Sequence, residues 1–269
     1  MKRAQAYAKI NLALVVGPLH EDGKHELVTV LQRIDLADDV AIEPADTLTV
    51  VGFEDDTLVR GALEGLAEAA GIAPRWRARI EKRIPVSSGL GGGSSDAASA
   101  LALTNSGLTK PLTSAQMHAI AASIGADIPF FLREGTQLAT GDGTELERIE
   151  LPLDYVAVIV LPDEESKEST AAVYGAFDRR NGAGGFDERR AALLHHLAEV
   201  EHARDLRRLP RNDLTSSPVA EQLEELGAFR ADVSGAGPAV YGLFEHADDA
   251  ERAAEIMSRD GETWMARPL

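Results

Sequence analysis

A cluster of glycine and serine residues gives the clearest chemical signal in the sequence. In the segment PVSSGLGGGSSDAA, residues 85–98, the four glycines Gly89, Gly91, Gly92 and Gly93 fall within five residues. Glycine accepts positive φ angles and has no Cβ that would keep a large anion away from the backbone. The N–H groups of such a loop can turn inward, and a helix starting at its end adds partial positive charge. The loop is therefore expected to bind a polyphosphate.

Two common phosphate-binding loops do not fit this segment. A Walker A loop ends in Gly-Lys-Ser/Thr, whereas these glycines lead into Ser94 and Ser95 without a lysine. The dinucleotide fingerprint requires glycine at its third spaced position, where Ser94 stands, and a preceding parallel strand. The plain alternative is a glycine-rich linker without a ligand, which does not explain why the segment runs directly from a strand into a helix.

The elements on either side of the loop have clear periodicity. From residue 75 to 84, apolar residues occupy most even positions and charged residues the odd ones, which is typical of an antiparallel strand with one solvated face. The arginines of this segment are expected to face solvent. After the loop, the alanine-rich stretch Asp96 to Leu103 favours a helix. The sequence thus predicts a strand, a phosphate loop and a helix in succession.

The remaining elements alternate between strand and helix along the chain. A new alternation opens after Pro152, so we expect one domain over residues 1–152 and a second over 153–269. Strands are predicted at residues 4–16, 39–43, 48–51, 155–161, 231–234 and 240–244 and near 264. Helices are predicted at residues 57–70, 113–124, 170–178, 187–203, 218–226 and 247–258.

Composition narrows the class of protein. The 269 residues carry 27 Lys and Arg against 44 Asp and Glu, a formal net charge of −17, and no cysteine. The lack of cysteine excludes disulfide scaffolds, thiolate zinc sites, iron–sulfur clusters and cysteine nucleophiles. The acidic balance argues against binding bare nucleic acid. No apolar run approaches the roughly 18 residues of a membrane span, so we expect no membrane contact and a cytoplasmic location.

Seven segments resemble motifs of the GHMP kinases, the family of galactokinase, homoserine kinase, mevalonate kinase and phosphomevalonate kinase. The phosphate loop matches the family pattern Pro-x-x-x-Gly-Leu-Gly-Ser-Ser-Ala with two extra glycines. The other matches follow the family order from Ala8 to Phe244. The matching segments are AKINLAL, DGKHEL, PVSSGLGGGSS, IGADIPFF, ESTAAVY, RNDL and SGAGPAVYGLF.

The resemblance implies an α+β fold of two domains. The N-terminal domain would be like ribosomal protein S5 domain 2 and the C-terminal domain ferredoxin-like, with ATP and substrate in the cleft between them. ATP would bind as its magnesium complex, and the sequence does not identify the metal ligands. The residues expected to bind ATP are Pro85, Val86, Ser87, Ser88, Gly89, Leu90, Gly91, Gly92, Gly93, Ser94 and Ser95.

Two residues are expected to carry the phosphoryl transfer. Asp127, in Gly-Ala-Asp-Ile-Pro, is the candidate general base for an acceptor hydroxyl. Lys9 stands in an otherwise apolar strand, and the resemblance implies that it pairs with Asp127 and helps to neutralise the transition state. Without the resemblance, a turn aspartate without chemistry and a solvent-facing edge lysine would be the simpler interpretations.

Five further positions are expected to contact the substrate, together with Asp127. Asn11 projects from the same strand face as Lys9. The resemblance implies that His25 hydrogen-bonds a cytosine edge and that Tyr174 lies near the base. It also places the small-residue turn of Gly235 and Gly237 beside the substrate and phosphates.

Within the family, the form GLGGGSSDAA is most similar to the kinases that phosphorylate the 2-hydroxyl of 4-diphosphocytidyl-2-C-methyl-D-erythritol in non-mevalonate isoprenoid synthesis. The expected partners are therefore ATP and a cytidine diphosphate-linked methylerythritol. Lys24 departs from this pattern because the family usually has a stacking tyrosine there, and Thr57 stands in place of an asparagine. A kinase for mevalonate or a sugar, and a nucleotide-binding regulator without turnover, remain as alternatives. The sequence does not give the oligomeric state.

Overall fold

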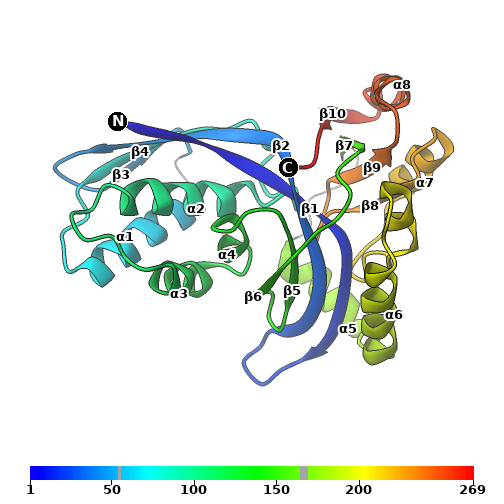
Figure 1. The fold of residues 1–269 in the computed structure, drawn as a ribbon, viewed down its shortest axis with the longest axis horizontal. Helices are drawn as coiled ribbons and strands as arrows, with labels where there is room; N and C mark the ends of the chain where they lie inside the picture. The colour runs from blue at the N-terminus through cyan, green and yellow to red at the C-terminus, as the bar shows by residue number, and fades with distance from the viewer. Residues whose placement is uncertain (54–55, 164–168) are drawn as a thin grey trace. The chain divides into compact units, whose positions relative to one another are not determined.

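The computed structural model describes residues 1–53, 56–163 and 169–269. The chain forms two compact units that alternate along the sequence (Figure 1). Unit 1 comprises residues 1–8, 37–86 and 91–134, and unit 2 comprises residues 9–36, 87–90 and 135–269. The glycine loop is therefore shared, with residues 87–90 in unit 2 and the residues on either side in unit 1. A single domain boundary near residue 152 stays a prediction.

Unit 1 contains a mixed sheet whose charged face matches the prediction. Strand β4 (Trp76–Glu81) pairs antiparallel with β2 (His25–Pro44), of which residues 37–44 belong to this unit, and parallel with β3 (Thr49–Val51). Alternate residues of β4 are buried, and its arginines are exposed. The sheet supplies acidic partners to these arginines, because Glu43 lies 3.6 Å from Arg77 across the β2–β4 pair.

Four helices of unit 1 share an apolar core with these strands (Figure 1). They are α1 (Leu58–Ala70), α2 (Gly92–Asn105), α3 (Ser114–Ile124) and α4 (Ile128–Phe131). The core joins strand residues such as Val40 and Ile80 to helix residues such as Leu66 and Leu101. Helix α3 starts with a capping box between Thr113 and Gln116, as its sequence favours.

Helix α2 begins earlier than the sequence predicts. We expected its start at Asp96, whereas the structure begins it at Gly92, so that Gly92, Gly93, Ser94 and Ser95 form its first turn. Low helix propensity made the glycines look like loop residues. The residue before them, Gly91, has a φ of 72° and occupies the N-cap position. Four of the eleven residues predicted to bind ATP therefore form a helix N-terminus.

Unit 2 contains a four-stranded antiparallel sheet in the order β10-β7-β9-β8. Its strands are β7 (Val156–Pro162), β8 (Arg230–Val233), β9 (Val240–Phe244) and β10 (Gly261–Ala266). Helices α7 (Pro218–Glu225) and α8 (Ala247–Met257) precede β8 and β10 and share a core with the sheet. This order and connectivity form the predicted ferredoxin-like arrangement, and the α+β class is confirmed.

The rest of unit 2 includes residues 9–19 of strand β1 (Lys2–Leu19), which pairs with β2. It also holds the β5–β6 hairpin and three helical segments. These elements are β5 (Thr136–Thr140), β6 (Glu145–Ile149), α5 (Thr170–Arg179), α6 (Phe186–Ala198) and the 3₁₀ helix η1 (Ala203–Arg208). The helix predicted to reach Ala203 thus ends at Ala198. No helix in the described part of the chain is long and apolar enough to cross a membrane.

Candidate active site

The first turn of helix α2, in unit 1, is suited to bind an anion. Among the described residues, no side chain caps this helix and no acidic side chain lies in its first turn. Its N–H groups and the positive end of its dipole therefore point to an anionic ligand. The glycine at position 92 allows close packing, because a Cβ placed on Gly92 would lie 3.0 Å from Ile84 Cγ2.

The loop preceding this helix alternates in backbone conformation. Ser87, Gly89 and Gly91 have φ angles of 53°, 87° and 72°. Such left-handed residues turn successive N–H groups to one side, as in anion-binding nests. Ser87 is the informative member, since a non-glycine residue in this region stores strain that is typical of functional loops. The phosphate-binding role of residues 85–95 remains a prediction, with this geometry in its support.

Lys9, in unit 2, is held by a chain of buried polar side chains. It is 3% exposed, and its Nζ donates to Asn11 Oδ1 at 2.6 Å. Asn11 Nδ2 donates to Thr29 Oγ1 at 2.8 Å, and that hydroxyl donates to the Ala13 carbonyl at 2.6 Å. Lys9 and Asn11 thus lie on one side of β1, as their spacing predicts. The chain of hydrogen bonds fixes the position of a buried ammonium group.

The turn of Gly235 lies directly against this lysine. A Cβ placed on Gly235 would lie 3.2 Å from Lys9 Nζ and 3.5 Å from Asn11 Oδ1. Part of the glycine loop joins them, because Lys9 N donates to the Leu90 carbonyl at 2.9 Å. Ser234 Oγ also donates to the Gly89 carbonyl at 3.0 Å. Three segments far apart in the sequence, each predicted to be functional, therefore meet within unit 2.

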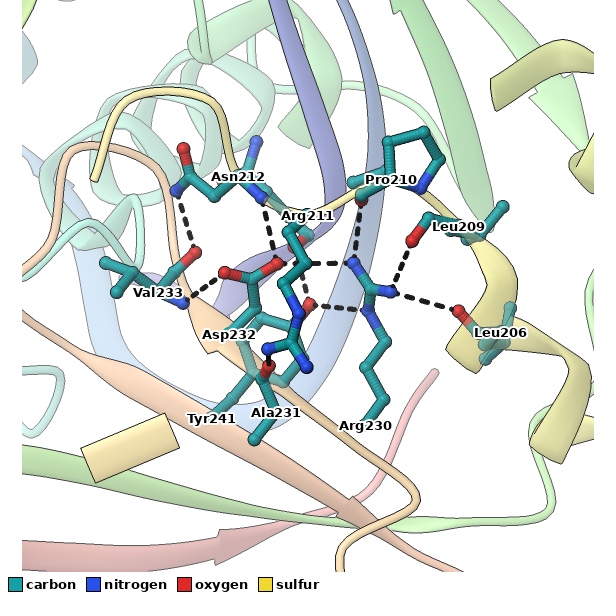
Figure 2. A network of polar contacts seen from close by, with 12 residues as sticks. Leu206, Leu209, Pro210, Arg211, Asn212, Arg230, Ala231, Asp232, Val233 and Tyr241 are labelled. Atoms are coloured by element: carbon teal, nitrogen blue, oxygen red, sulfur yellow. Dashed lines mark hydrogen bonds and ion pairs between the residues drawn. The ribbon is translucent and has the colours of Figure 1, made fainter. Parts of the chain in front are cut away.

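A buried arginine organises the chain behind this turn. Figure 2 shows Arg230, 3% exposed, reaching three backbone carbonyls of the η1 segment. Its Nη1 donates to Leu206 and Leu209 at 3.2 and 2.7 Å, and its Nη2 donates to Pro210 at 2.9 Å. The Asp232 carboxylate lies 3.2 Å from Nη2 and balances the charge. Burial raises the pKa of Asp232, although Arg230 opposes the shift.

Asn212 and Tyr241 extend the same network to strand β8, to the turn of Gly235 and to strand β1. Asn212 Nδ2 donates to the Val233 carbonyl at 2.9 Å (Figure 2) and to the Gly235 carbonyl at 2.6 Å. Tyr241, on β9, donates its hydroxyl to the Asn11 carbonyl at 2.9 Å. Burial raises the pKa of Tyr241 to about 12, so the hydroxyl remains a donor at neutral pH. The network therefore positions both the turn and the backbone beside Lys9.

His25 belongs to a small aromatic cluster in unit 2. Its ring centroid lies 5.0 Å from that of Tyr174 and 5.8 Å from that of Phe177. Its Nε2 lies 2.8 Å from Asp178 Oδ1. The structure thus brings together the two residues predicted to contact a base, His25 and Tyr174, and adds Asp178. Contact of these residues with a cytosine remains a prediction.

The neighbouring Lys24 has a different environment. Its ammonium group forms an ion pair with Asp142, which raises the pKa of Lys24. Lys24 and Asp142 also line an open, largely charged pocket of about 740 Å³. The side chain that replaces the family's usual tyrosine is thus engaged with the turn of the β5–β6 hairpin.

Asp127, in unit 1, occupies the N-cap position of helix α4. It is half-buried, and the three residues that follow it, Ile128, Pro129 and Phe130, are buried. This short helix was not predicted, because its four residues offer too little periodicity. The role of Asp127 as a base remains a prediction.

The structure adds several residues that sequence reasoning did not single out. For Thr29, Arg230 and Asp232 the signal was weak, because a polar residue in a strand shows its partners only once the strands are paired. Asn212 and Tyr241 had the clearest signals, since they lie in the RNDL and SGAGPAVYGLF motifs. The added positioning residues are Thr29, Asp178, Asn212, Arg230, Asp232 and Tyr241.

Comparisons with known proteins agree with this arrangement. The model of the GHMP kinases N terminal domain matches residues 57–135, and that of the GHMP kinases C terminal domain matches residues 183–263. A 4-diphosphocytidyl-2-C-methyl-D-erythritol kinase of Chlorobium luteolum is 38% identical, covering 93% of this chain and 91% of the relative. The kinase of the same name from Prosthecochloris aestuarii is 35% identical, covering 98% and 95%.

Solved structures give the same result. A crystal structure of 4-(cytidine 5'-diphospho)-2C-methyl-D-erythritol kinase covers 99% of both chains at 32% identity, with a TM-score of 0.79. The mevalonate kinase of Methanococcus jannaschii covers 100% of this chain and 98% of its own at 14% identity, with a TM-score of 0.76, and so shares the fold. The two family models and the nearly full-length likeness to these relatives show that this chain belongs to the GHMP kinase family.

Proposed function

We propose that this GHMP kinase transfers the γ-phosphate of ATP to the 2-hydroxyl of 4-diphosphocytidyl-2-C-methyl-D-erythritol in the cytoplasm. The observation that carries the proposal is the likeness to the solved kinase named for that substrate, at 32% identity over 99% of both chains. GHMP kinases use ATP as the phosphate donor, so the donor follows from the family. The acceptor and its 2-hydroxyl are the specific part of the proposal.

The phosphate loop and helix α2 would hold the phosphates of ATP. The first turn of α2 offers backbone N–H groups, and Ser87, Gly89 and Gly91 have the left-handed angles of an anion nest. Backbone binding suits a chain of net charge −17, because it needs few cationic side chains. Residues 85–95 fit ATP on these grounds. Magnesium, when bound with ATP, would neutralise phosphate charge, largely through waters.

Asp127 and Lys9 would have separate roles in the reaction. Asp127 would accept the proton of the acceptor hydroxyl, a contribution of roughly 100- to 10,000-fold for a positioned base. Lys9 would stabilise the negative charge of the transferring phosphoryl group, since a buried and fixed ammonium is effective where charge develops. His25 and Tyr174 would bind the cytosine, and Asn11, Gly235 and Gly237 would line the acceptor.

A substrate panel tests the proposal. The purified protein, with ATP and Mg²⁺, would be given 4-diphosphocytidyl-2-C-methyl-D-erythritol, mevalonate or homoserine, and ADP release would be followed. We expect turnover with the cytidine compound alone, and ³¹P NMR of the product should place the new phosphate on the 2-oxygen. Turnover with mevalonate or homoserine instead would overturn the acceptor. ATP binding without any turnover would favour a regulatory protein.

A further inference from the structure

A half-buried lysine and two buried aspartates connect the two ends of the glycine loop in unit 1. Lys82 follows strand β4, three residues before Pro85. Its Nζ donates to Asp38 Oδ2 at 2.5 Å and to Asp96 Oδ2 at 2.8 Å. Both carboxylates are fully buried, and the lysine side chain is 16% exposed. None of the three was predicted to be functional.

Asp38 fixes the chain that enters the loop. Its Oδ1 accepts from the backbone N–H groups of Arg83 and Ile84 at 2.5 and 2.8 Å, in addition to the Lys82 bond made by Oδ2. A carboxylate with three donors holds the segment that contributes them in one conformation. The path of the chain into Pro85 is therefore set by Asp38.

Asp96 and Gly92 connect Lys82 to the chain that leaves the loop. Asp96 lies in helix α2, directly after its first turn. The ammonium group also packs against that turn, because a Cβ placed on Gly92 would lie 3.1 Å from Lys82 Nζ. One ammonium group thus joins Asp38, which holds the entry segment, to the helix N-terminus.

We propose that Lys82 is a positioning residue for ATP binding, which fixes the first turn of α2 relative to the segment that enters the glycine loop. The inference rests on the proposed function only in taking ATP as the ligand of the loop. Its physical basis is preorganisation: a phosphate site built from backbone N–H groups binds well only if those groups already lie in place. A buried ion pair is a costly way to gain stability alone, so a positioning role explains its presence better.

The charges around Asp96 make its ion pair with Lys82 sensitive to pH. Burial raises the pKa of Asp96 to about 7, with Lys82 opposing and with Asp38 and Asp56 adding to the shift. Within the described residues, Asp96 Oδ1 has no hydrogen-bond partner, in keeping with a carboxylate that burial disfavours. Burial opposes the charge on Lys82, but Asp96 and Asp38 outweigh it and raise the pKa of Lys82. The ion pair between Lys82 and Asp96 is therefore strongest above pH 7, where Asp96 is ionised.

Replacing the ammonium group tests the proposal. We expect Lys82→Met to raise the Kd for ATP roughly 10- to 100-fold at pH 8, while the KM for the acceptor changes by less than about threefold. The exposed Lys110 of the same unit gives the matched control, and Lys110→Met should leave both constants unchanged. Lys82→Arg keeps the charge and should recover part of the affinity. Isothermal titration calorimetry and steady-state kinetics provide the constants.

Two outcomes would overturn the proposal. One is a folded Lys82→Met protein that binds ATP within twofold of the wild type. The other is an equal loss for ATP and acceptor, which would indicate general damage. Wild-type turnover in the same assay tests the proposed function separately, so the two failures are distinguishable.

A second variant keeps the test decisive if Lys82→Met does not fold. Asp96→Asn removes the titrating carboxyl and keeps its shape. We expect the ratio of wild-type to variant ATP affinity to rise between pH 6 and pH 8.5, as Asp96 ionises in the wild type. Titration of ATP itself is common to both proteins and cancels in the ratio. A ratio that stays constant across this range would show that Lys82 and Asp96 do not position the site.

Discussion

At the scale of single residues, the burial of the Lys9 amine costs stability, so its presence calls for a functional explanation. An ammonium group that is 3% exposed loses most of its hydration, and such desolvation costs several kcal/mol. The chain through Asn11 and Thr29 offsets part of this cost with hydrogen bonds. An apolar residue would stabilise this strand more simply. The burial of this lysine therefore supports the role proposed for it in phosphoryl transfer.

Asp127→Asn tests the proposed base. The amide keeps the shape of the carboxyl but cannot accept the proton, so we expect kcat to fall about 100-fold or more. ATP should bind nearly as well as in the wild type, because the phosphate loop is unchanged. Single-turnover kinetics and calorimetry with ATP check the two parts. Unchanged turnover would remove Asp127 from the mechanism.

Tyr174→Ala tests the proposed recognition of cytosine. A base stacked on an aromatic ring gains about 1–3 kcal/mol, so loss of the ring should raise the KM for the cytidine substrate roughly 5- to 150-fold. Tyr174→Phe retains the ring face and should keep the wild-type KM. The KM for ATP should stay constant in both variants. If alanine leaves the KM for the cytidine substrate unchanged, the base binds elsewhere.

At the scale of elements, the glycine loop depends on backbone space as well as on backbone freedom. Gly89 has a φ of 87°, and a Cβ there would lie 2.0 Å from the Ser234 carbonyl oxygen. Gly71, the C-cap of α1, has a φ of 67°, but a Cβ there would meet nothing within 4 Å. Both positions require a left-handed backbone, but only at Gly89 would a Cβ clash with a neighbouring backbone atom.

Alanine at these two positions separates the two effects. We expect Gly71→Ala to lower the free energy of unfolding by about 1–2 kcal/mol, the cost of a left-handed alanine. Gly89→Ala should cost a further 1–3 kcal/mol or so, because the backbone must move, and should weaken ATP binding at least tenfold. Urea unfolding and calorimetry measure both. Equal losses of stability, with ATP affinity retained, would contradict the packing of this loop.

The sequence predicted those elements whose signals are local. The alternation in β4 could be foreseen from periodicity, and the ferredoxin-like order of strands and helices was implied by the resemblance to the GHMP kinases. The start of α2 could not, because glycine propensity opposes the helix that packing against Ile84 and Leu58 imposes. The bonds from Lys82 to Asp38 and Asp96 were also hidden, since they depend on strand pairing and on the early start of α2.

At the scale of the whole molecule, buried carboxyl groups and net charge act in the same direction. Burial raises the pKa of Asp56, Asp96 and Asp232 above the ordinary value of 3.8. Between pH 4 and pH 7 the folded chain therefore keeps protons that the unfolded chain has released. The net charge of −17 adds repulsion once the carboxyl groups are ionised. Asp142 opposes the trend: burial raises its pKa, but the hydrogen bonds from Lys24 and Thr144 and the charge of Lys24 together outweigh burial and lower it.

The protein should therefore lose stability as pH rises. Groups with a raised carboxyl pKa stabilise the fold fully below pH 4, and this contribution is lost as pH passes through the folded pKa, near 7 for Asp96. We expect the free energy of unfolding to fall from pH 5.5 to pH 8, by at most about 1.4 kcal/mol per pH unit for each proton involved. Urea unfolding at several pH values measures the slope. Asp96→Asn should flatten it, because that variant has no carboxyl to ionise at this position, and an unchanged slope would show that Asp96 does not titrate in this range.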